Sequence, residues 1–306
     1  MSASISAQAE HNLFNPDDFE AARQSRDARF DGRFFVGVLT TGIYCRPVCP
    51  VRIPRKENVQ LYRSAAAAAA AGFRPCLRCR PESSPGTPAW SGSSWKVSRA
   101  LQLIDRGFLD TESVEELAMQ LGIGPRQLAR LFQSHLGASP VEVAQTRRLH
   151  FAKQLIDETS MPLSEVCFAA GFGSVRRFHA VFVKTYGRSP RQLRDKQGRR
   201  RARRQASLQL KLSYRPPFDW QSMLAFLAYR AIPGVEVVTE NSYGRTFSLD
   251  GGQGHFEVRF GEQDNAVNVL IVAPQSRQLT HIVDRIRSLF DLRADSDKID
   301  KKFSKD

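Results

Sequence analysis

The sequence has few acidic residues for its length and no long apolar run. Only 31 of its 306 residues are Asp or Glu, against 45 Lys and Arg, so the formal net charge is +14. This excess of positive charge favours a polyanionic partner, nucleic acid before a membrane surface. No apolar stretch is long enough to cross a bilayer, so no membrane partner is expected. The length and the 42% apolar content predict two or three folded domains.

A secretory leader is also missing. Residues 1–30 are polar and charged and contain no apolar core. We therefore expect a reducing, cytoplasmic compartment, in association with the nucleoid, where disulfides are rare. Residues 1–12 are expected to form a disordered tail.

Cysteine is scarce, but four of the five cysteines form two closely spaced pairs, CxxxC and CxxC. Thiolates at such spacings can bind one metal ion from a single turn, and two pairs complete the tetrahedron that Zn²⁺ prefers. Two disulfides or four unrelated thiols are the alternatives. We predict one Zn²⁺ in a four-cysteine site, with these ligands: Cys45, Cys49, Cys76 and Cys79. The fifth, Cys167, lies on an apolar helix face and is expected to be a packed thiol.

A small α/β fold is predicted around these cysteines. A helix followed by a strand is expected within 14–38, and a further short strand at 58–62. Ser64 can cap a helix made almost wholly of alanine, 65–71, which Gly72 ends. This short helix leads directly into the second cysteine pair.

Two similar helical units follow a Pro/Ser/Gly linker at 84–94. Residues 113–132 and 163–182 each contain an amphipathic helix, a glycine turn and a second helix with exposed basic residues. This is the pattern of a helix-turn-helix, although an ordinary helical bundle has similar periodicity. A long helix at 140–159 connects the two units. We predict an all-α double helix-turn-helix domain over 95–196.

The last third of the chain changes to alternating apolar and polar residues. Residues 207–295 are predicted to form an α+β domain with an antiparallel sheet and helices at 218–231 and 276–290. The basic run at 197–206 is either a solvated linker or a phosphate contact. Residues 296–306 form a charged tail. The whole chain is therefore expected to be a multidomain α+β protein.

The residues around the first cysteine pair resemble a known family. The segment Thr40–Pro47, with Thr-Thr-Gly-Ile-Tyr-Cys-Arg-Pro, together with Asp31–Val38 and Gly72–Cys76, is similar to the metal-binding domain of Ada-family adaptive-response DNA repair proteins. The resemblance covers about residues 14–83 and both cysteine pairs, and it implies a zinc and methyl-acceptor domain over 13–83. It implies that Cys45 accepts a methyl group from a DNA methylphosphotriester. Spacing alone favours a zinc site that is purely structural.

Two further resemblances cover the rest of the chain. Residues 95–195, ending with Tyr186–Arg194, resemble the DNA-binding domain of AraC-family regulators. Residues 214–220 and 230–236 resemble the N-terminal domain of AlkA-type alkylbase glycosylases. That family's catalytic domain would begin about where this sequence ends, so glycosylase activity is not expected. The PCHR motif of alkylguanine transferases is also absent.

Together these resemblances imply a stoichiometric DNA-methylphosphotriester:protein-cysteine methyltransferase joined to a transcriptional activator of the alkylation response. The expected partners are double-stranded DNA and RNA polymerase. A monomer is expected, because two DNA-reading units in one chain remove the need for a dimer. Two alternatives stay open. One is a zinc-containing AraC-type regulator without methyl transfer, and the other is a remnant of a bifunctional regulator and 3-methyladenine DNA glycosylase.

Residues that contact DNA are predicted in two groups. The resemblance implies contacts near the metal from Thr41, Arg52 and Arg74. Pro50 stands where relatives can carry an arginine, and its side chain has no donor for a phosphate. The second helices of the two helical units supply the other group: Arg126, Gln127, Arg130, Arg176, Arg177 and His179.

Overall fold

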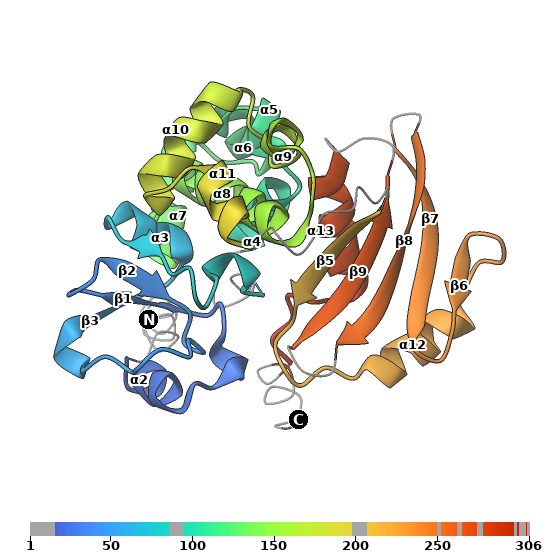
Figure 1. Cartoon of the computed structure of the whole chain (residues 1–306), viewed down its shortest axis with the longest axis horizontal. Helices are drawn as coiled ribbons and strands as arrows, with labels where there is room; N and C mark the ends of the chain where they lie inside the picture. Colours follow the sequence, from blue (N-terminus) through green and yellow to red (C-terminus); the bar gives the residue numbers. More distant parts are fainter. Residues whose placement is uncertain are drawn as a thin grey trace, which may run out of the picture. The chain divides into compact units, whose positions relative to one another are not determined.

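The computed structural model confirms a multidomain α+β fold (Figure 1). It describes residues 16–85, 95–197, 207–249, 252–261, 265–273, 278–296, 299 and 304. Contacts divide the chain into two compact units, Met1–Thr146 and Arg147–Asp306. The predicted tail 1–12 and most of the predicted segments 84–94, 197–206 and 296–306 lie outside the described residues. The predicted domain boundaries stay predictions.

The first unit begins with helix α2 (Pro16–Ser25) and a four-stranded sheet in the order β3-β1-β2-β4. The strands are β1 (Phe35–Val38), β2 (Ile43–Cys45), β3 (Val59–Tyr62) and β4 (Arg74–Pro75). Short 3₁₀ turns precede β1, precede β3 and follow β4: η1 (Ala28–Phe30), η2 (Lys56–Asn58) and η3 (Pro81–Ser83). Strand β1 pairs antiparallel with β2 and β3, whereas β2 and β4 are parallel.

Strand β1 is buried on both faces, although the sequence suggests one apolar face. Val36 packs with Phe19 of α2 on one side. Phe35 packs with Tyr44 and Ala68 on the other. The central position of β1, between helices on opposite faces of the sheet, explains why even Phe35 is only 3% exposed.

The alanine-rich segment forms the predicted short helix, α3 (Ala65–Ala70). Ser64 caps it by accepting a hydrogen bond from the Ala67 N–H at 3.0 Å. Gly72 follows the helix with φ +90°, a conformation that favours glycine. Because alanine side chains are small, the helix lies close to the sheet, and Ala68 is completely buried.

The first helical unit is a helix-turn-helix, as predicted. It contains α4 (Trp95–Asp105), α5 (Phe108–Thr111), α6 (Val114–Gln120) and α7 (Pro125–Leu136). Ser113 and Glu116 form a capping box at the start of α6. Gly122, at φ +64°, makes the turn between α6 and α7. Leu117 of α6 packs against Leu128 and Phe132 of α7 in one core.

The second helical unit repeats this design with α9 (Leu163–Ala169), α10 (Val175–Tyr186) and α11 (Pro190–Gln197). Helices α7 and α10 both end at a glycine with positive φ, Gly137 and Gly187. A serine two residues later caps the next helix, Ser139 for α8 (Pro140–Glu158) and Ser189 for α11. The internal repeat therefore extends past each helix-turn-helix into the helix that follows it.

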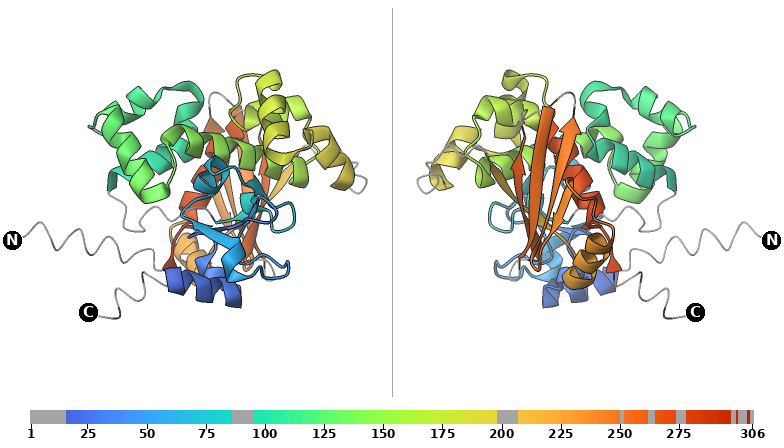
Figure 2. Two further views of the ribbon diagram at one scale, coloured as in Figure 1. Left: turned by 90° about the vertical axis from the view of Figure 1, so that its left-hand side faces the viewer. Right: turned by 90° about the vertical axis from the view of Figure 1, so that its right-hand side faces the viewer.

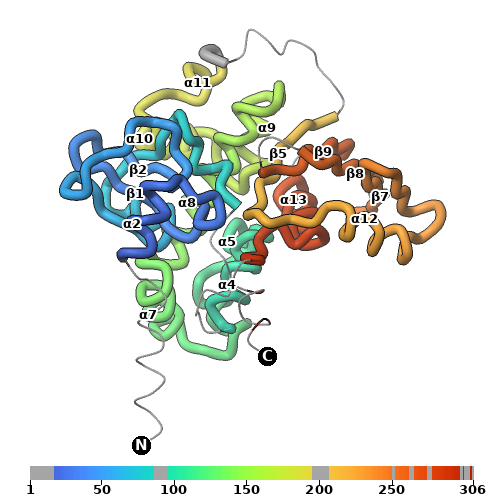
Figure 3. Tube along the Cα trace, turned by 90° about the horizontal axis from the view of Figure 1, so that it is seen from below, coloured from blue at the N-terminus to red at the C-terminus, as the bar shows by residue number. Residues whose placement is uncertain are grey.

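The C-terminal sheet has five strands in the order β5-β9-β8-β7-β6, all paired antiparallel (Figure 2). They are β5 (Leu208–Ser213), β6 (Glu236–Val238), β7 (Ser242–Leu249), β8 (Gly252–Gly261) and β9 (Ala266–Val272). Helix α12 (Trp220–Tyr229) follows β5, and α13 (Leu279–Leu289) lies beside the sheet (Figure 3). Helix α13 begins at Leu279 among the described residues, and the predicted start at residue 276 lies outside them.

Among the described helices, none has the length and apolar character that crossing a membrane requires.

Replacing Gly37 of β1 with alanine is expected to destabilise the first sheet. The added Cβ would lie 2.7 Å from Tyr62 Cε2 and 3.0 Å from Phe73 Cε1, and these two rings pack against each other. Such overpacking costs about 1–3 kcal/mol of unfolding free energy, measurable by urea unfolding. Gly173→Ala is the control, because its Cβ would meet no atom within 4 Å. Equal stability of the two variants would contradict the described packing.

Candidate metal centre and DNA interface

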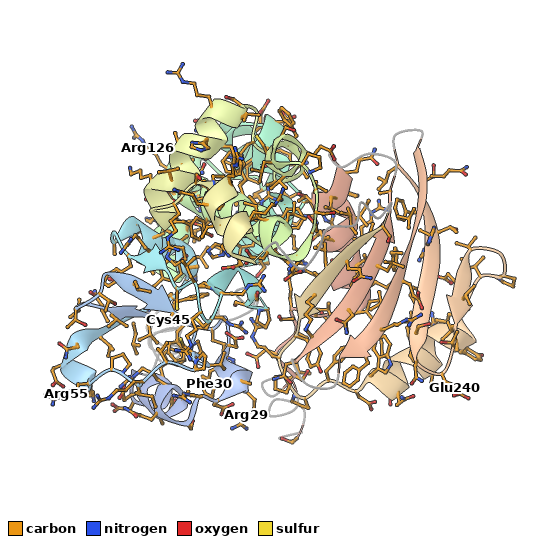
Figure 4. All side chains as sticks on the ribbon, viewed as in Figure 1. Arg29, Phe30, Cys45, Arg55, Arg126 and Glu240 are labelled. Carbon is orange, nitrogen blue, oxygen red and sulfur yellow. The ribbon has the colours of Figure 1, made fainter. Side chains whose placement is uncertain are left out.

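The four paired cysteines come together at the ends of two neighbouring strands. Cys45 ends β2, and Cys76 directly follows β4. Because β2 and β4 are parallel, with Ile43 opposite Arg74, the chain leaves both strands at the same end of the sheet. Cys49 and Cys79 lie in the two turns that follow. Figure 4 labels Cys45 at the end of its strand.

The geometry of this cluster fits a four-sulfur zinc site. All four ligand atoms lie within 4.8 Å of one another, and the four residues are only 7–8% exposed. A tetrahedron with Zn–S bonds of about 2.3 Å requires sulfur atoms about 3.8 Å apart. All five cysteines are free thiols, so the disulfide alternative is not supported. Cys167 is completely buried, as predicted for a packed thiol.

The cluster thiols share protons among themselves. Hydrogen bonds from neighbouring cysteines, chiefly Cys49, raise the pKa of Cys45, and those from Cys45 lower the pKa of Cys49 to about 7. In the same way the pKa of Cys79 is raised and that of Cys76 is lowered, in each case first by Cys45. Thiols that already share protons at close range are suited to lose them to a divalent cation.

Backbone N–H groups approach three of the four sulfur atoms. The Arg46 N–H donates to Cys79 Sγ, and the Arg78 N–H donates to Cys76 Sγ, both at 3.4 Å. The backbone of Val51 also helps to lower the pKa of Cys49 by hydrogen bonding. No backbone N–H from the described residues makes a comparable contact with Cys45. Its sulfur is therefore the least hydrogen-bonded of the set.

A buried ion pair fixes the turn between Cys45 and Cys49. Arg46 Nε lies 3.0 Å from both carboxylate oxygens of Asp31, which is 4% exposed. Arg46 Nη1 donates to the Cys79 carbonyl at 3.2 Å and so connects the two cysteine turns. Sequence reasoning assigned no role to this pair. The two residues lie 15 positions apart and several charged residues surround Asp31, so no signal in the sequence singled out this pair.

The three residues predicted to contact DNA near the metal are all exposed. Thr41 lies in the turn between β1 and β2, and its N–H donates to the Val38 carbonyl. Arg74 lies on β4, and its N–H donates to the Gly42 carbonyl at 2.8 Å, which places it beside that turn. Arg52 follows the first cysteine turn, next to the exposed Pro50 in the same loop. Their DNA contacts stay predictions.

The residues predicted on the second helices are exposed as well. On α7 the buried Leu128 and Phe132 leave the predicted residues on the solvent side (Figure 4 labels Arg126). On α10 the buried Phe178 and Phe182 likewise leave the predicted residues on the solvent side of the helix. The exposed residues are Arg126, Gln127, Arg130, Arg176, Arg177 and His179. Each helix thus has a basic face opposite its packed face, as groove or phosphate contact requires.

The metal-binding domain also contacts the end of α7. Ser64 Oγ donates to the Leu136 carbonyl at 2.7 Å, and Arg63 Nη1 donates to the Ser134 carbonyl at 2.8 Å. Ser64 is 5% exposed, so the first contact is shielded from water. These bonds satisfy carbonyls that have no partner within the helix.

The second unit contains a pocket of about 440 Å³ that was not predicted. Aromatic side chains of α12 and its surroundings line it, including Phe218 and Phe226. Two acidic residues also border it. Asp219 caps α12, accepting from the Ser222 N–H at 3.0 Å and from its hydroxyl at 2.6 Å. Burial raises the pKa of Asp291.

A buried four-cysteine site that fits Zn²⁺, together with two helix-turn-helix units that have exposed basic faces, places the chain in the class of zinc-containing helix-turn-helix proteins. Family models agree with each part. Residues 18–82 match the metal binding domain of Ada, 117–196 match a helix-turn-helix domain, and 209–306 match the AlkA N-terminal domain.

The chain belongs to the Ada family. It is 32% identical over 171 residues to the Bacillus subtilis bifunctional transcriptional activator/DNA repair enzyme AdaA, a match that covers 56% of this chain and 79% of the relative. It is 43% identical over 289 residues to a probable bifunctional transcriptional activator/DNA repair enzyme AlkA of Mycobacterium tuberculosis. That match covers 92% of this chain but 58% of the relative. The chain therefore spans little more than half of that relative's length.

Solved structures of Ada are also similar to parts of the chain. The DNA methyl phosphotriester repair domain of Escherichia coli Ada is 47% identical, with 22% of this chain and 74% of that chain covered and a TM-score of 0.21. The methylated N-Ada/DNA complex is 34% identical, with 44% of this chain and 97% of that chain covered and a TM-score of 0.22.

Replacing one cluster cysteine is expected to abolish zinc binding. Wild-type protein should contain one Zn²⁺ per chain, and Cys49→Ser should contain almost none, because three thiolates and a hydroxyl form a much weaker site. Elemental analysis after gel filtration measures the zinc content of both proteins. Acidification should also release zinc from wild type, since protons compete for thiolate sulfur. Cys167→Ala is the control and should keep its zinc; loss of zinc there would contradict the assignment.

Proposed function

We propose that this chain repairs DNA methylphosphotriesters by irreversible methyl transfer to Cys45, and that the transfer converts it into a transcriptional activator. The proposal is supported above all by the sulfur cluster, in which backbone N–H groups contact the other three sulfur atoms but none from the described part of the chain contacts Cys45. The chain would act once and stoichiometrically.

The hydrogen-bond pattern favours Cys45 as the nucleophile. A hydrogen-bond donor stabilises the negative charge of a thiolate and so makes that sulfur atom a weaker nucleophile. Cys49, Cys76 and Cys79 are therefore the less reactive members of the set. Bound zinc would keep the sulfur atoms deprotonated at neutral pH. The ion pair of Arg46 with Asp31 would hold the Cys45 turn in place during the reaction.

The transfer is a single displacement at carbon. The Cys45 thiolate attacks the methyl carbon of the phosphotriester, a carbon–sulfur bond forms, and the carbon–oxygen bond breaks. The electron pair of that bond leaves with the phosphodiester oxygen, which restores the normal anionic DNA backbone. No proton is transferred. The thioether carbon–sulfur bond that forms is stable in water, so the step is not reversed.

Methylation would then change the charge that the DNA encounters. Four thiolates on Zn²⁺ carry a formal charge of about −2, and methylation of one reduces it to about −1. For a phosphate 10 Å from the cluster, the loss of one negative charge relieves about 0.4–1.7 kcal/mol of electrostatic repulsion, for dielectric constants between 80 and 20. The relieved repulsion adds up over several phosphates and is reduced by salt, and the sum would strengthen promoter binding. Helices α7 and α10 would supply the groove contacts, and the bound protein would recruit RNA polymerase.

Glycosylase activity is not proposed for this chain. Both oxygens of Asp219, an acid at the pocket, accept hydrogen bonds from Ser222 as a helix cap, which lowers the pKa of Asp219. A carboxylate occupied in this way is poorly suited to act as a general base.

Incubation with methylphosphotriester DNA is expected to add one methyl group to the wild-type protein. The intact mass should increase by one methyl, and peptide mapping should place it on Cys45. Cys45→Ser should gain nothing, because its hydroxyl is not ionised at neutral pH. The zinc content of each protein is measured first. A zinc-loaded wild type that gains no methyl would leave the metal with a structural role only.

Methylated protein is expected to bind promoter DNA about tenfold more tightly than unmethylated protein at low salt, because less negative charge faces the phosphates. A salt titration by fluorescence anisotropy measures the difference, which should shrink as salt rises. Cys45→Ser exposed to the same methylated DNA is the control. Equal affinities of the two forms at every salt concentration would disprove the switch.

A further inference from the structure

The C-terminal sheet domain and the second helix-turn-helix share one hydrophobic core. Buried residues of α8 and α10, such as Leu155 and Phe178, belong to the same cluster as Leu212 of β5 and Ile282 of α13. Domains that are joined only by a linker bury separate cores, with few contacts between them. The C-terminal domain is therefore part of the packing that supports the second helix-turn-helix.

Helix α8 covers the free edge of strand β5. In the five-stranded sheet β5 is an edge strand, and Lys211 faces Asn268 of β9. On its other side the Lys211 N–H donates to Glu158 Oε2 at 3.0 Å, and Gln154 Nε2 donates to the Lys211 carbonyl at 2.8 Å. Gln154 is 2% exposed and also donates to Glu158 at 3.1 Å. Two side chains of α8 thus replace the acceptor and the donor of a neighbouring strand.

Helix α13 holds the end of α9. Thr280, in the first turn of α13, donates its hydroxyl hydrogen bond to the Ala169 carbonyl at 2.8 Å. Ala169 is the last residue of α9, where carbonyls lack partners within the helix. The turn into α10 follows at once, through Gly171 at φ +88°. Thr280 therefore fixes the point from which α10 departs.

We propose that the C-terminal domain is an intramolecular clamp for the second helix-turn-helix. Its edge strand β5 binds α8 and its helix α13 binds α9, so that α10 is held in one orientation for DNA. The clamp gives this domain a role in DNA recognition, separate from methyl transfer and from base excision. It rests on the proposed DNA-binding role of α10.

Hydrogen exchange in the full-length protein without DNA tests the clamp directly. Thr280→Val keeps the shape of the side chain but removes the bond to Ala169. Amides of the α9–α10 turn should then exchange about tenfold faster. Gln154→Ala, which removes a bond to Lys211, should accelerate exchange in α8 and β5. Thr246→Val is the control, because its hydroxyl bonds to the Val235 carbonyl within the sheet domain itself.

DNA binding tests the consequence. The probe is a duplex selected from a random pool by unmethylated wild-type protein. Thr280→Val and Gln154→Ala should each bind it about tenfold more weakly, which corresponds to about 1.4 kcal/mol, and Thr246→Val should bind it as wild type does. Methyl transfer to Cys45 should be unchanged in all three variants, because their substitutions lie in the second unit.

Two results would overturn the clamp. One is unchanged exchange in the α9–α10 turn of Thr280→Val. The other is faster exchange with unchanged DNA affinity, which would show that the contact stabilises α9 without orienting α10. Absence of methyl transfer in the wild type would instead overturn the proposed repair function. The exchange and affinity measurements do not depend on that transfer, so the two failures can be told apart.

Discussion

The convergence of four sulfur atoms is the constraint on which the metal-binding domain depends. The parallel pairing of β2 with β4 places Cys45 and Cys76 side by side. The two turns that follow, connected by Arg46, add the remaining ligands. A domain this small buries little apolar surface, so metal binding is expected to supply much of its folding free energy. The same sulfur atoms that stabilise the domain are those from which the proposed reaction takes its nucleophile.

The two helix-turn-helix units have the same local design but different supports. In both, a glycine with positive φ ends the second helix, and a serine then caps the helix that follows. A hydroxyl from a neighbouring domain also satisfies a carbonyl at a helix end in each unit, from Ser64 to α7 and from Thr280 to α9. The first helix-turn-helix is thus supported by the metal-binding domain, and the second by the C-terminal domain.

Features set by nearby residues could be predicted from the sequence. The spacing of Cys45 and Cys49, the cap at Ser64 and the turn at Gly122 depend on local chemistry, and the structure confirms all three. The burial of Phe35 could not be predicted, because it depends on a helix that packs on the second face of the sheet. The contact of the Arg46 N–H with Cys79 Sγ and the bond between Gln154 and Lys211 depend on long-range folding in the same way. Such contacts have no periodic signal in a sequence.

Ser64 has a consequence for how the first unit responds to its metal. One oxygen atom accepts from the Ala67 N–H at the start of α3 and donates to the Leu136 carbonyl at the end of α7. Whatever stabilises α3 therefore also favours the ordered end of α7. Zinc that binds the folded cysteine cluster, next to α3, would add part of its binding free energy to the stability of α7, the helix proposed to contact DNA. Through a single hydroxyl group, zinc binding is thus expected to stabilise a helix that belongs to the proposed DNA interface.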